Sequence, residues 1–187
     1  MHICIYTVET CMYQQVIKGF NESMEDRRSV DDTTLARYSH VVSIEINSRT
    51  GELMRLEKSK GKDFAKKYVA ENPQAVTTAS GMVYHELVSG MGAFPKGLES
   101  KVTVHYHGTL ISGDVFDSSV ARGEPIVFSL GQVIGGWQEG LQLMKAGGRA
   151  RLVIPSDLAY GDNGSAPAIR PGATLVFEVE LISIEDN

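Results

Sequence analysis

The chain has 187 residues, 42% of them hydrophobic and 22% charged, and a formal net charge of −5 at pH 7. This length fits one domain with an appendage, and the hydrophobic share is sufficient for a buried core. The negative charge argues against nucleic acid as the main partner. No apolar run approaches the roughly 20 residues that a membrane-spanning helix needs, so we expect no membrane span.

The cysteine spacing and the first residues bear on the compartment. Cys4 and Cys11 are too far apart for a metal knuckle or a redox pair, and we interpret them as ordinary thiols. Residues 1–17 lack a basic segment followed by an apolar stretch and a small-residue cleavage site. As written, the sequence therefore predicts a cytoplasmic protein. The alternative is the bacterial periplasm or the cell surface, if a leader is missing from the sequence.

The first third of the chain carries helical patterns. Apolar side chains recur at the spacing of one helix face at Tyr13, Ile17, Phe20 and Met24. Residues 30–34, Val-Asp-Asp-Thr-Thr, offer capping side chains for a second helix. That helix is expected to end at Asn72-Pro73, because a residue that precedes proline disfavours the helical conformation.

Residues 35–57 fit two different structures. Apolar residues occupy one helix face at Leu35, Val42, Ile46, Leu53 and Leu56. Yet Val42, Ile44 and Ile46 also alternate with polar residues as in a strand, and residues 47–51, Asn-Ser-Arg-Thr-Gly, can turn a hairpin. The residue pattern alone favours neither, so helix and hairpin both stay open for residues 42–56.

The remainder of the chain has strand patterns. We expect a short polar linker at 74–80 and strands at 82–89, 101–110, 125–130, 149–154 and 175–181. In the last strand apolar residues alternate with Glu178 and Glu180, a pattern typical of an antiparallel sheet with one buried face. A short helix is expected after Gly135-Gly136. These elements predict an α+β domain in which a bent antiparallel β-sheet is wrapped around one short helix.

Aromatic residues gather in the same half of the chain. In the strand at 101–110, Tyr106 shares the apolar face with Val102 and Val104. Phe116 and Asp117 then bring a ring beside a carboxylate where the chain turns. Further members follow at Phe128, Val133, Ile134, Trp137, Tyr160, Ile169 and Phe177. An aromatic-lined cavity with a few polar groups at its rim has the composition of a binding site.

Other kinds of site find less support. His105 and His107 lie on one strand face, but no third ligand at short spacing accompanies them, so we interpret them as a surface or sheet-face pair. Ser118 and Ser119 beside an aspartate suggest a nucleophile, but no pattern brings a histidine near them. The glycines of residues 131–136 have neither the dinucleotide-binding spacing nor a following Lys-Ser/Thr, which argues against a nucleotide site.

Several segments together resemble a known family. They are Val104-His-Tyr-His-Gly108, Phe116-Asp-Ser-Ser119, Val133-Ile-Gly-Gly-Trp137-Gln-Glu-Gly140, Leu158-Ala-Tyr-Gly161 and Ala173-Thr-Leu-Val-Phe-Glu-Val-Glu-Leu181. In order and spacing they are similar to the signature of the FKBP-type peptidyl-prolyl cis-trans isomerases, over roughly residues 80–187. The N-terminal half is less closely similar to the dimerisation arm of the macrophage-infectivity-potentiator branch of that family.

The resemblance implies a domain organisation. It favours one long helix over residues 32–71 instead of a hairpin. It places an α-helical N-terminal dimerisation arm with its linker at 1–78 and an FKBP-type isomerase domain at 79–187. It implies a homodimer formed through the N-terminal helices, proline-containing polypeptides as clients, and neither a cofactor nor a metal.

The resemblance also assigns roles to single residues. Trp137 is expected to form the floor of the catalytic cavity. The expected walls are Tyr106, Phe116, Phe128, Val133, Ile134 and Phe177. The backbone N–H of Ile134 and the hydroxyl of Tyr160 are expected to hold ligand carbonyls. Asp117 is expected at the rim, where it influences a polarised carbonyl or holds Tyr106, and Ile169 is expected in a flap over the cavity.

The implied reaction is rotation about X-Pro peptide bonds in folding proteins, by desolvation in an aromatic pocket. The same pocket is a candidate site for macrolide immunosuppressants. Ile169-Arg170-Pro171 stands where Ile-Pro-Pro is frequent in the family, and Ile126 stands where some members carry an aromatic residue. These departures bear on substrate preference and drug affinity. The alternative function, from another class, is a binding module that holds proline-containing segments without turnover.

Overall fold

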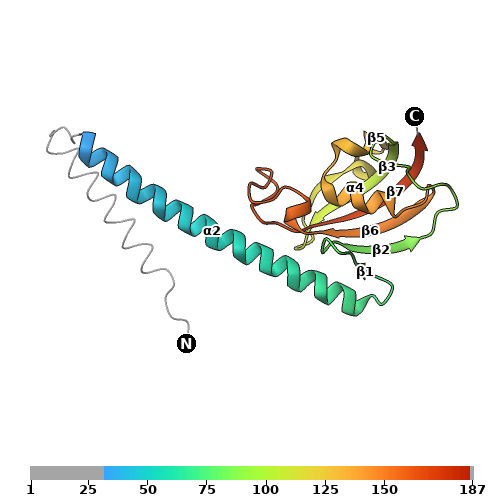
Figure 1. Cartoon of the computed structure of the whole chain (residues 1–187), viewed down its shortest axis with the longest axis horizontal. Helices are drawn as coiled ribbons and strands as arrows, with labels where there is room; N and C mark the ends of the chain where they lie inside the picture. The colour runs from blue at the N-terminus through green and yellow to red at the C-terminus, as the bar shows by residue number, and fades with distance from the viewer. Residues whose placement is uncertain (1–31, 186–187) are drawn as a thin grey trace. The chain divides into compact units, whose positions relative to one another are not determined.

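The computed structural model of the chain describes residues 32–185 (Figure 1). The predicted first helix, with Tyr13, Ile17, Phe20 and Met24, lies outside these residues, as do both cysteines. Internal contacts divide the chain into two compact units, residues 1–49 and 50–187. The first helix of the described range, α2 (Asp32–Glu71), begins in the former unit and ends in the latter.

Helix α2 resolves the ambiguity of residues 42–56, because the whole range is helical. The helix favoured by the family resemblance is therefore confirmed, and the hairpin alternative is wrong. The helix ends where Asn72 and Pro73 were expected to stop it. The backbone N–H of Asn72 donates to the Tyr68 carbonyl at 3.0 Å, and its side-chain amide donates to the same carbonyl at 2.8 Å. These bonds satisfy an acceptor that the end of a helix otherwise leaves unpaired.

A seven-stranded antiparallel sheet follows, in the order β1-β2-β6-β7-β3-β4, with β5 also paired to β3. Its strands are β1 (Val76–Thr77), β2 (Val83–Val88), β3 (Lys101–Leu110), β4 (Val115–Ser118), β5 (Ile126–Ser129), β6 (Gly148–Ile154) and β7 (Leu175–Glu185). The predicted α+β fold is confirmed. Residues 74–80, expected to be a linker, contain the edge strand β1.

Four short helices connect the strands. They are α3 (Ser119–Arg122), α4 (Gly135–Gln142) and the 3-10 turns η1 (Leu130–Gln132) and η2 (Ser156–Leu158). Helix α4 is the expected short helix, and it lies against one face of the sheet (Figure 1). A Cβ at Gly136 would lie 2.8 Å from Ile154 Cδ1, and one at Gly140 would lie 2.7 Å from Leu152 Cδ1. The two glycines therefore allow α4 to approach β6 closely.

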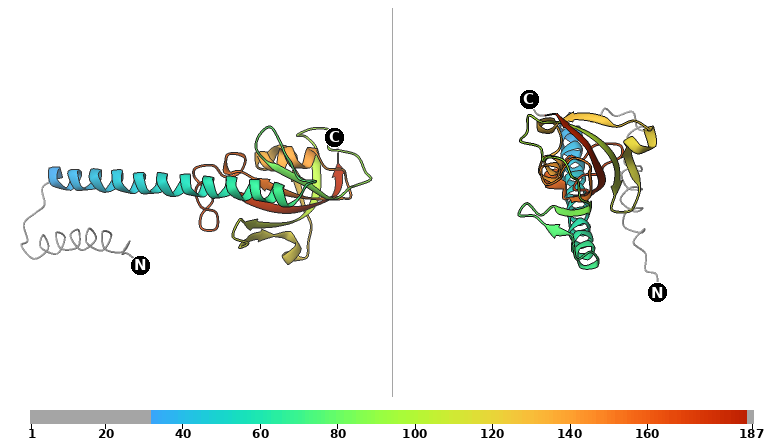
Figure 2. Two further views of the ribbon diagram at one scale, coloured as in Figure 1. Left: turned by 90° about the horizontal axis from the view of Figure 1, so that it is seen from below. Right: turned by 90° about the vertical axis from the view of Figure 1, so that its right-hand side faces the viewer.

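The opposite face of the sheet is covered by the second half of α2, within the unit 50–187. Tyr68 is buried there with Val83, Val153 and Val176, one residue each from β2, β6 and β7. Phe64, Ala65 and Val69 pack against the same cluster. The left view of Figure 2 shows this part of the helix, in green, running along the sheet. Both faces of the sheet are thus covered by helix, one by α4 and the other by α2.

Candidate active site

The side chain of Trp137, in the first turn of α4, is 4% exposed and lies at the centre of a group of rings. The centroids of Tyr106, Phe128 and Phe177 lie 5.2, 5.5 and 5.3 Å from the Trp137 ring, all in edge-to-face arrangements. Phe116 adds a further edge-to-face contact to Phe177 at 5.4 Å. Such pairs are worth about 0.5–1.5 kcal/mol each beyond the area that they bury. We call these five residues the aromatic cluster.

The aromatic cluster draws on α4 and on strands β3, β4, β5 and β7. Gly108 of β3 makes room for two of the rings. A Cβ at this position would lie 2.8 Å from Phe116 Cζ and 2.9 Å from Phe177 Cε1. The glycine that ends the segment Val104-His-Tyr-His-Gly108 is therefore required by the close approach of the two phenylalanine edges.

Polar groups border the cluster at Tyr106. Its hydroxyl donates to Asp117 Oδ2, and the guanidinium of Arg122 donates to Asp117 Oδ1. Arg122 also donates to the Tyr106 hydroxyl at 3.0 Å, and its guanidinium carbon lies 5.8 Å from the centroid of the Tyr106 ring. We call these three residues the polar triplet. It holds the Tyr106 ring in one orientation.

The polar triplet shifts the pKa values of its members in a consistent way. Burial raises the pKa of Tyr106, and its hydrogen bond to the Asp117 carboxylate raises it further, against a smaller effect of Arg122. Burial alone would raise the pKa of Asp117, but the hydrogen bonds from Tyr106 and Arg122 together outweigh it and hold that pKa below its ordinary value. At neutral pH the tyrosine is therefore protonated and the aspartate is ionised.

Sequence reasoning missed Arg122, which completes the polar triplet. It ends the one-turn helix α3, where Ser118 caps the start by accepting from the Ala121 N–H at 3.1 Å. Gly123 ends the turn with a φ of 76°, in the left-handed region that favours glycine. The capping serine and the terminal glycine were visible in the sequence as a helix signature, and they turn Arg122 back toward Asp117.

Ser118 and Ser119 lie beside two histidines, a proximity that no sequence pattern indicated. His105 Nδ1 lies 3.1 Å from Ser119 Oγ, and His107 Nδ1 lies 3.0 Å from Ser118 Oγ. The Ser119 hydroxyl also accepts from the Tyr106 backbone N–H at 2.8 Å. Both serines are buried, with exposures of 5% and 0%. Their bonds join β3 to the residues after β4, which is a structural role and gives no access for a substrate.

The other predicted site residues lie at different depths. Val133 and Ile134 pack against the core that contains the aromatic cluster, and Ile169 is buried there with 6% exposure. Ile134 immediately precedes α4, and within the described residues its N–H donates to no protein acceptor. Tyr160 is 40% exposed, and its hydroxyl has no protein partner in the same part of the chain. The indole N–H of Trp137 is buried and likewise unpaired among the described residues.

Residues 32–185 show neither a metal-binding group nor a membrane-spanning helix. Residues 32–185 contain no group of three or more His, Cys, Asp or Glu side chains arranged to hold a metal ion. None of the helices in this range is long and apolar enough to cross a membrane.

Comparison with known proteins places the chain in a family. Residues 98–182 match the family model described as FKBP-type peptidyl-prolyl cis-trans isomerase. The chain is 38% identical over 175 residues to FkpA of Escherichia coli K12, covering 91% of this chain and 64% of that protein. It is 48% identical over 118 residues to the macrophage infectivity potentiator of Trypanosoma cruzi, covering 63% and 60%. It thus spans somewhat less than two thirds of the length of both relatives.

Solved structures of related proteins have the same fold as this chain. The crystal structure of FkpA from Escherichia coli matches with a TM-score of 0.76 and 37% identity, covering 92% of this chain and 82% of that one. A peptidyl-prolyl cis-trans isomerase from Pseudomonas syringae matches with a TM-score of 0.65 and 38% identity, covering 71% and 96%. Both the fold and the sequence therefore agree along most of the chain.

The predicted cytoplasmic location is wrong. It rested on the composition of residues 1–17, whereas the FkpA relatives are periplasmic bacterial proteins. Because the sequence spans only 64% of the length of FkpA, its first residues carry no information about a leader. The resemblance on which the other expectations rested is confirmed: the chain belongs to the family of FKBP-type peptidyl-prolyl cis-trans isomerases.

Proposed function

We propose that the chain accelerates cis-trans isomerisation of X-Pro peptide bonds in proline-containing polypeptides, at the aromatic cluster. The observation that carries this proposal is the edge-to-face packing of Tyr106, Phe128 and Phe177 around a buried Trp137, with the Tyr106 hydroxyl held by a carboxylate. An apolar aromatic surface suits the prolyl ring, and polar groups beside it suit the flanking peptide carbonyls.

For this reaction, the main contribution of the protein is the environment in which it holds the X-Pro amide. Rotation about the X-Pro bond has a barrier of about 18–20 kcal/mol, because the amide loses its resonance as it twists. The twisted amide is less charge-separated than either planar form, so a site that withholds water from the carbonyl favours it. Each 1.4 kcal/mol or so of such preference gives about a tenfold gain in rate.

We assign the roles as follows. Trp137 forms the floor beneath the prolyl ring, and the walls are Tyr106, Phe116, Phe128, Val133, Ile134 and Phe177. The N–H of Ile134 and the hydroxyl of Tyr160 hold substrate carbonyls; both lack a protein partner within the described residues, which supports this assignment. Ile169 closes the site from the loop before β7.

Asp117 acts in this proposal by holding Tyr106, one of two roles that the family resemblance left open. Its carboxylate accepts from the Tyr106 hydroxyl and from Arg122, so both of its oxygens are engaged within the protein. A carboxylate in this state is poorly suited to act on a substrate carbonyl. Arg122 is a positioning residue, since it acts on the substrate through Asp117 and Tyr106.

We also propose that the chain is a homodimer, that residues 1–78 form its arm and that residues 79–187 carry the isomerase activity. Exposed apolar side chains on α2 support the dimer. Val42, Leu53 and Leu56 are 46%, 63% and 51% exposed, which is unusual on a helix with no partner. Macrolide immunosuppressants are proposed as competitors for the aromatic cluster, with an affinity that Arg170 and Ile126 influence.

Exchange NMR on a short X-Pro peptide, with and without the protein, tests the activity. We expect the cis and trans signals to exchange faster when catalytic amounts of the chain are present. Trp137→Leu should reduce this acceleration strongly, while Arg149→Gln, on an exposed residue of β6, should leave it unchanged. An unaccelerated exchange at stoichiometric protein, with peptide binding retained, would instead make the chain a binding module.

A further inference from the structure

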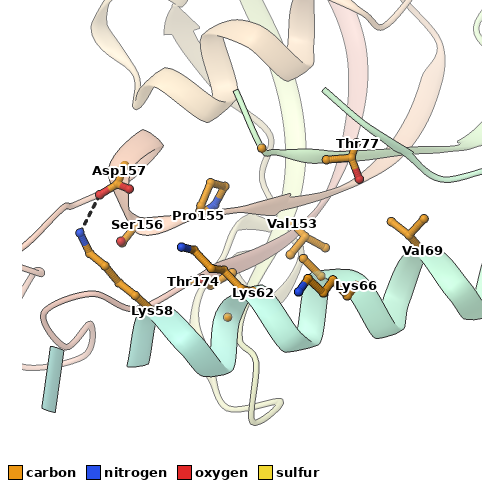
Figure 3. Close-up of a pocket in the computed structure, with 13 residues that line it drawn as sticks. Lys58, Lys62, Lys66, Val69, Thr77, Val153, Pro155, Ser156, Asp157 and Thr174 are labelled. Carbon is orange, nitrogen blue, oxygen red and sulfur yellow. Dashed lines mark hydrogen bonds and ion pairs between the residues drawn. The ribbon is translucent and has the colours of Figure 1, made fainter. Parts of the chain in front are cut away.

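A cavity of about 410 Å³ lies between the second half of α2 and the strands β1 and β6 (Figure 3). All of its lining residues belong to the unit 50–187. Its volume is in the range of sites that bind small ligands or short peptide segments. It is separate from the aromatic cluster, because Val153 of β6 faces it, whereas the neighbouring Leu152 and Ile154 face the core under α4.

The helix side of this cavity is cationic. Lys58, Lys62 and Lys66 line it at successive turns of α2. Lys58 is engaged, because its ammonium forms ion pairs with Asp157 at 2.8 Å and Asp162 at 2.7 Å. Lys62 and Lys66 are exposed, and neither has an ion-pair partner among residues 32–185. On a chain of net charge −5, this is a local site of positive charge that fits an anionic ligand.

The remaining walls of the cavity are largely apolar. Ala65 and Val69 of α2 line it together with Pro155 and with Val153, which is 1% exposed and belongs to the cluster that Ala65 and Val69 pack against. Figure 3 shows Thr77 of β1 on the side opposite Lys66 and Val69. Strand β1 is the edge of the sheet, so its outward backbone N–H and C=O groups have no neighbouring strand within residues 32–185. An extended segment bound in the cavity therefore meets an apolar floor, two free ammonium groups and a strand edge.

The spacing of the lysines matches an extended peptide. Residues four apart on a helix are about 6 Å apart along its axis. Alternate residues of an extended strand are about 6.6–6.8 Å apart and point to the same side. A segment with an acidic residue at every second position therefore brings carboxylates to Lys62 and Lys66 in turn, while the residues between them point elsewhere.

We propose that this cavity, the lysine groove, is a second docking site that binds acidic, partly apolar segments of client polypeptides. The class of client rests on the function proposed above, but the site itself does not require a proline. It holds a client by a segment distant in sequence from the X-Pro bond, which raises the effective concentration of that bond at the aromatic cluster.

Fluorescence anisotropy with labelled peptides tests the proposal on the full chain. The probe is a peptide of alternating glutamate and valine without proline, and its control has lysine in place of glutamate. We expect only the acidic peptide to bind, and its binding to weaken as salt is added, because exposed charges are screened. Methyl NMR should report shifts at Val69 and Val153 on titration.

Paired variants of α2 localise the binding. Lys62→Glu with Lys66→Glu should weaken the acidic peptide by about fivefold to tenfold or more, since two ion pairs become repulsive contacts. Lys60→Glu with Lys67→Glu is the matched control: it changes the net charge equally on the same helix, but these lysines pair with Glu57 and Glu71 and do not line the groove. The control should bind as the parent does.

Several outcomes would overturn the proposal. One is an equal loss of acidic-peptide affinity in the Lys62→Glu, Lys66→Glu variant and in its Lys60→Glu, Lys67→Glu control. Another is equal affinity of the parent for the acidic and the basic peptide. A third is binding of sodium octanoate but not of the acidic peptide, which would mark a site for small amphiphilic anions. Isomerisation of a short X-Pro peptide should be unchanged in the Lys62→Glu, Lys66→Glu variant. If the parent lacks that activity, the proposed isomerase function fails, whatever the result for the groove.

Discussion

At the scale of single residues, the polar triplet determines what Tyr106 can offer a substrate. Its hydroxyl proton is committed to Asp117, and Arg122 donates to the same oxygen. Burial and the neighbouring carboxylate raise the pKa of Tyr106, so the hydroxyl stays neutral at physiological pH. The substrate therefore meets the face and edge of this ring, while the hydroxyl serves to fix the ring's orientation.

The first prediction concerns the pH dependence of stability. The pKa of Asp117 is lowered from its ordinary value of 3.8 in the folded protein, so the unfolded chain binds more protons as pH falls through that value. The stability that this carboxylate contributes should be complete above about pH 4 and should disappear as pH falls through the lowered pKa. Urea denaturation at a series of pH values should show Asp117→Asn less stable than the parent near neutrality and equally stable at the acid end.

The matched control for Asp117→Asn is a second aspartate, Asp114, in an exposed turn. Asp114→Asn makes the same change in an exposed turn, where the carboxylate accepts from Ser112 at 2.7 Å, and the difference from the parent should be small. The Asp117 side chain is itself 41% exposed, so solvent screening keeps its contribution modest. A parent-to-variant difference that stays constant across the pH range would contradict the role assigned to the ionised carboxylate.

The sequence predicted the aromatic side of the site better than its polar side. The rings of Trp137, Phe128 and Phe177 meet because strand and helix periodicity already places each of them on an apolar face. Arg122 contacts Asp117 only because a single helical turn reverses the chain between them, and no periodicity reports such a turn. Tyr160 was expected at the same site; its side chain is 40% exposed, and its role there stays a prediction.

At the scale of elements, α2 illustrates where residue patterns fail. The range 42–56 alternates like a strand as well as like a helix, and β-branched residues such as Val42 and Ile44 raise strand propensity. Residues 42–56 are helical as part of one continuous helix. The last turns of that helix pack on the sheet through Tyr68 and Val69. Local sequence could not supply this information, because the stabilising contacts of the helix lie far along the chain.

The second prediction compares two glycines of α2. Gly61 is buried against Thr174, and a Cβ there would lie 2.7 Å from the Thr174 Cβ. Gly61→Ala should therefore destabilise the protein by about 1–3 kcal/mol, the usual cost of overpacking. Gly51 has nothing within 4 Å of the same position, so Gly51→Ala should stabilise the helix by about 0.5–1 kcal/mol. Thermal melting of the two variants and the parent measures whether each substitution raises or lowers stability. A gain of stability at Gly61 would mean that α2 does not press against the sheet.

At the scale of the whole molecule, the packing of α2 on the sheet sets the extent of the smallest stable catalytic fragment. Residues 50–187 form one compact unit, in which α2 covers Val83, Val153 and Val176 on the sheet. A fragment that starts at residue 79 retains the aromatic cluster but uncovers this face. Full burial of one such side chain is worth about 1.5–3 kcal/mol, so the loss is large on the scale of domain stability.

The third prediction follows from that burial. The fragment 50–187 should melt close to the isomerase unit of the full chain, whereas 79–187 should melt at a clearly lower temperature. Below its melting temperature 79–187 should still isomerise a short X-Pro peptide, because every residue assigned to the site lies within it. Equal melting temperatures for the two fragments would mean that α2 contributes nothing to the stability of the sheet.

The last prediction concerns assembly. Leu53 and Leu56 are exposed apolar residues on α2, and a closed two-fold contact is the simplest way to cover such residues on a long helix. Light scattering at micromolar concentration should report a dimer for the full chain and a monomer for residues 79–187. Leu53→Glu with Leu56→Glu should convert the full chain to a monomer, while Lys60→Gln with Lys67→Gln, on exposed residues of the same helix, should leave it dimeric.

Activity on a short X-Pro peptide should be the same in all of these proteins, because the aromatic cluster needs no residue from a second copy. A monomeric full chain, or a dimeric 79–187 fragment, would place the interface elsewhere or remove it.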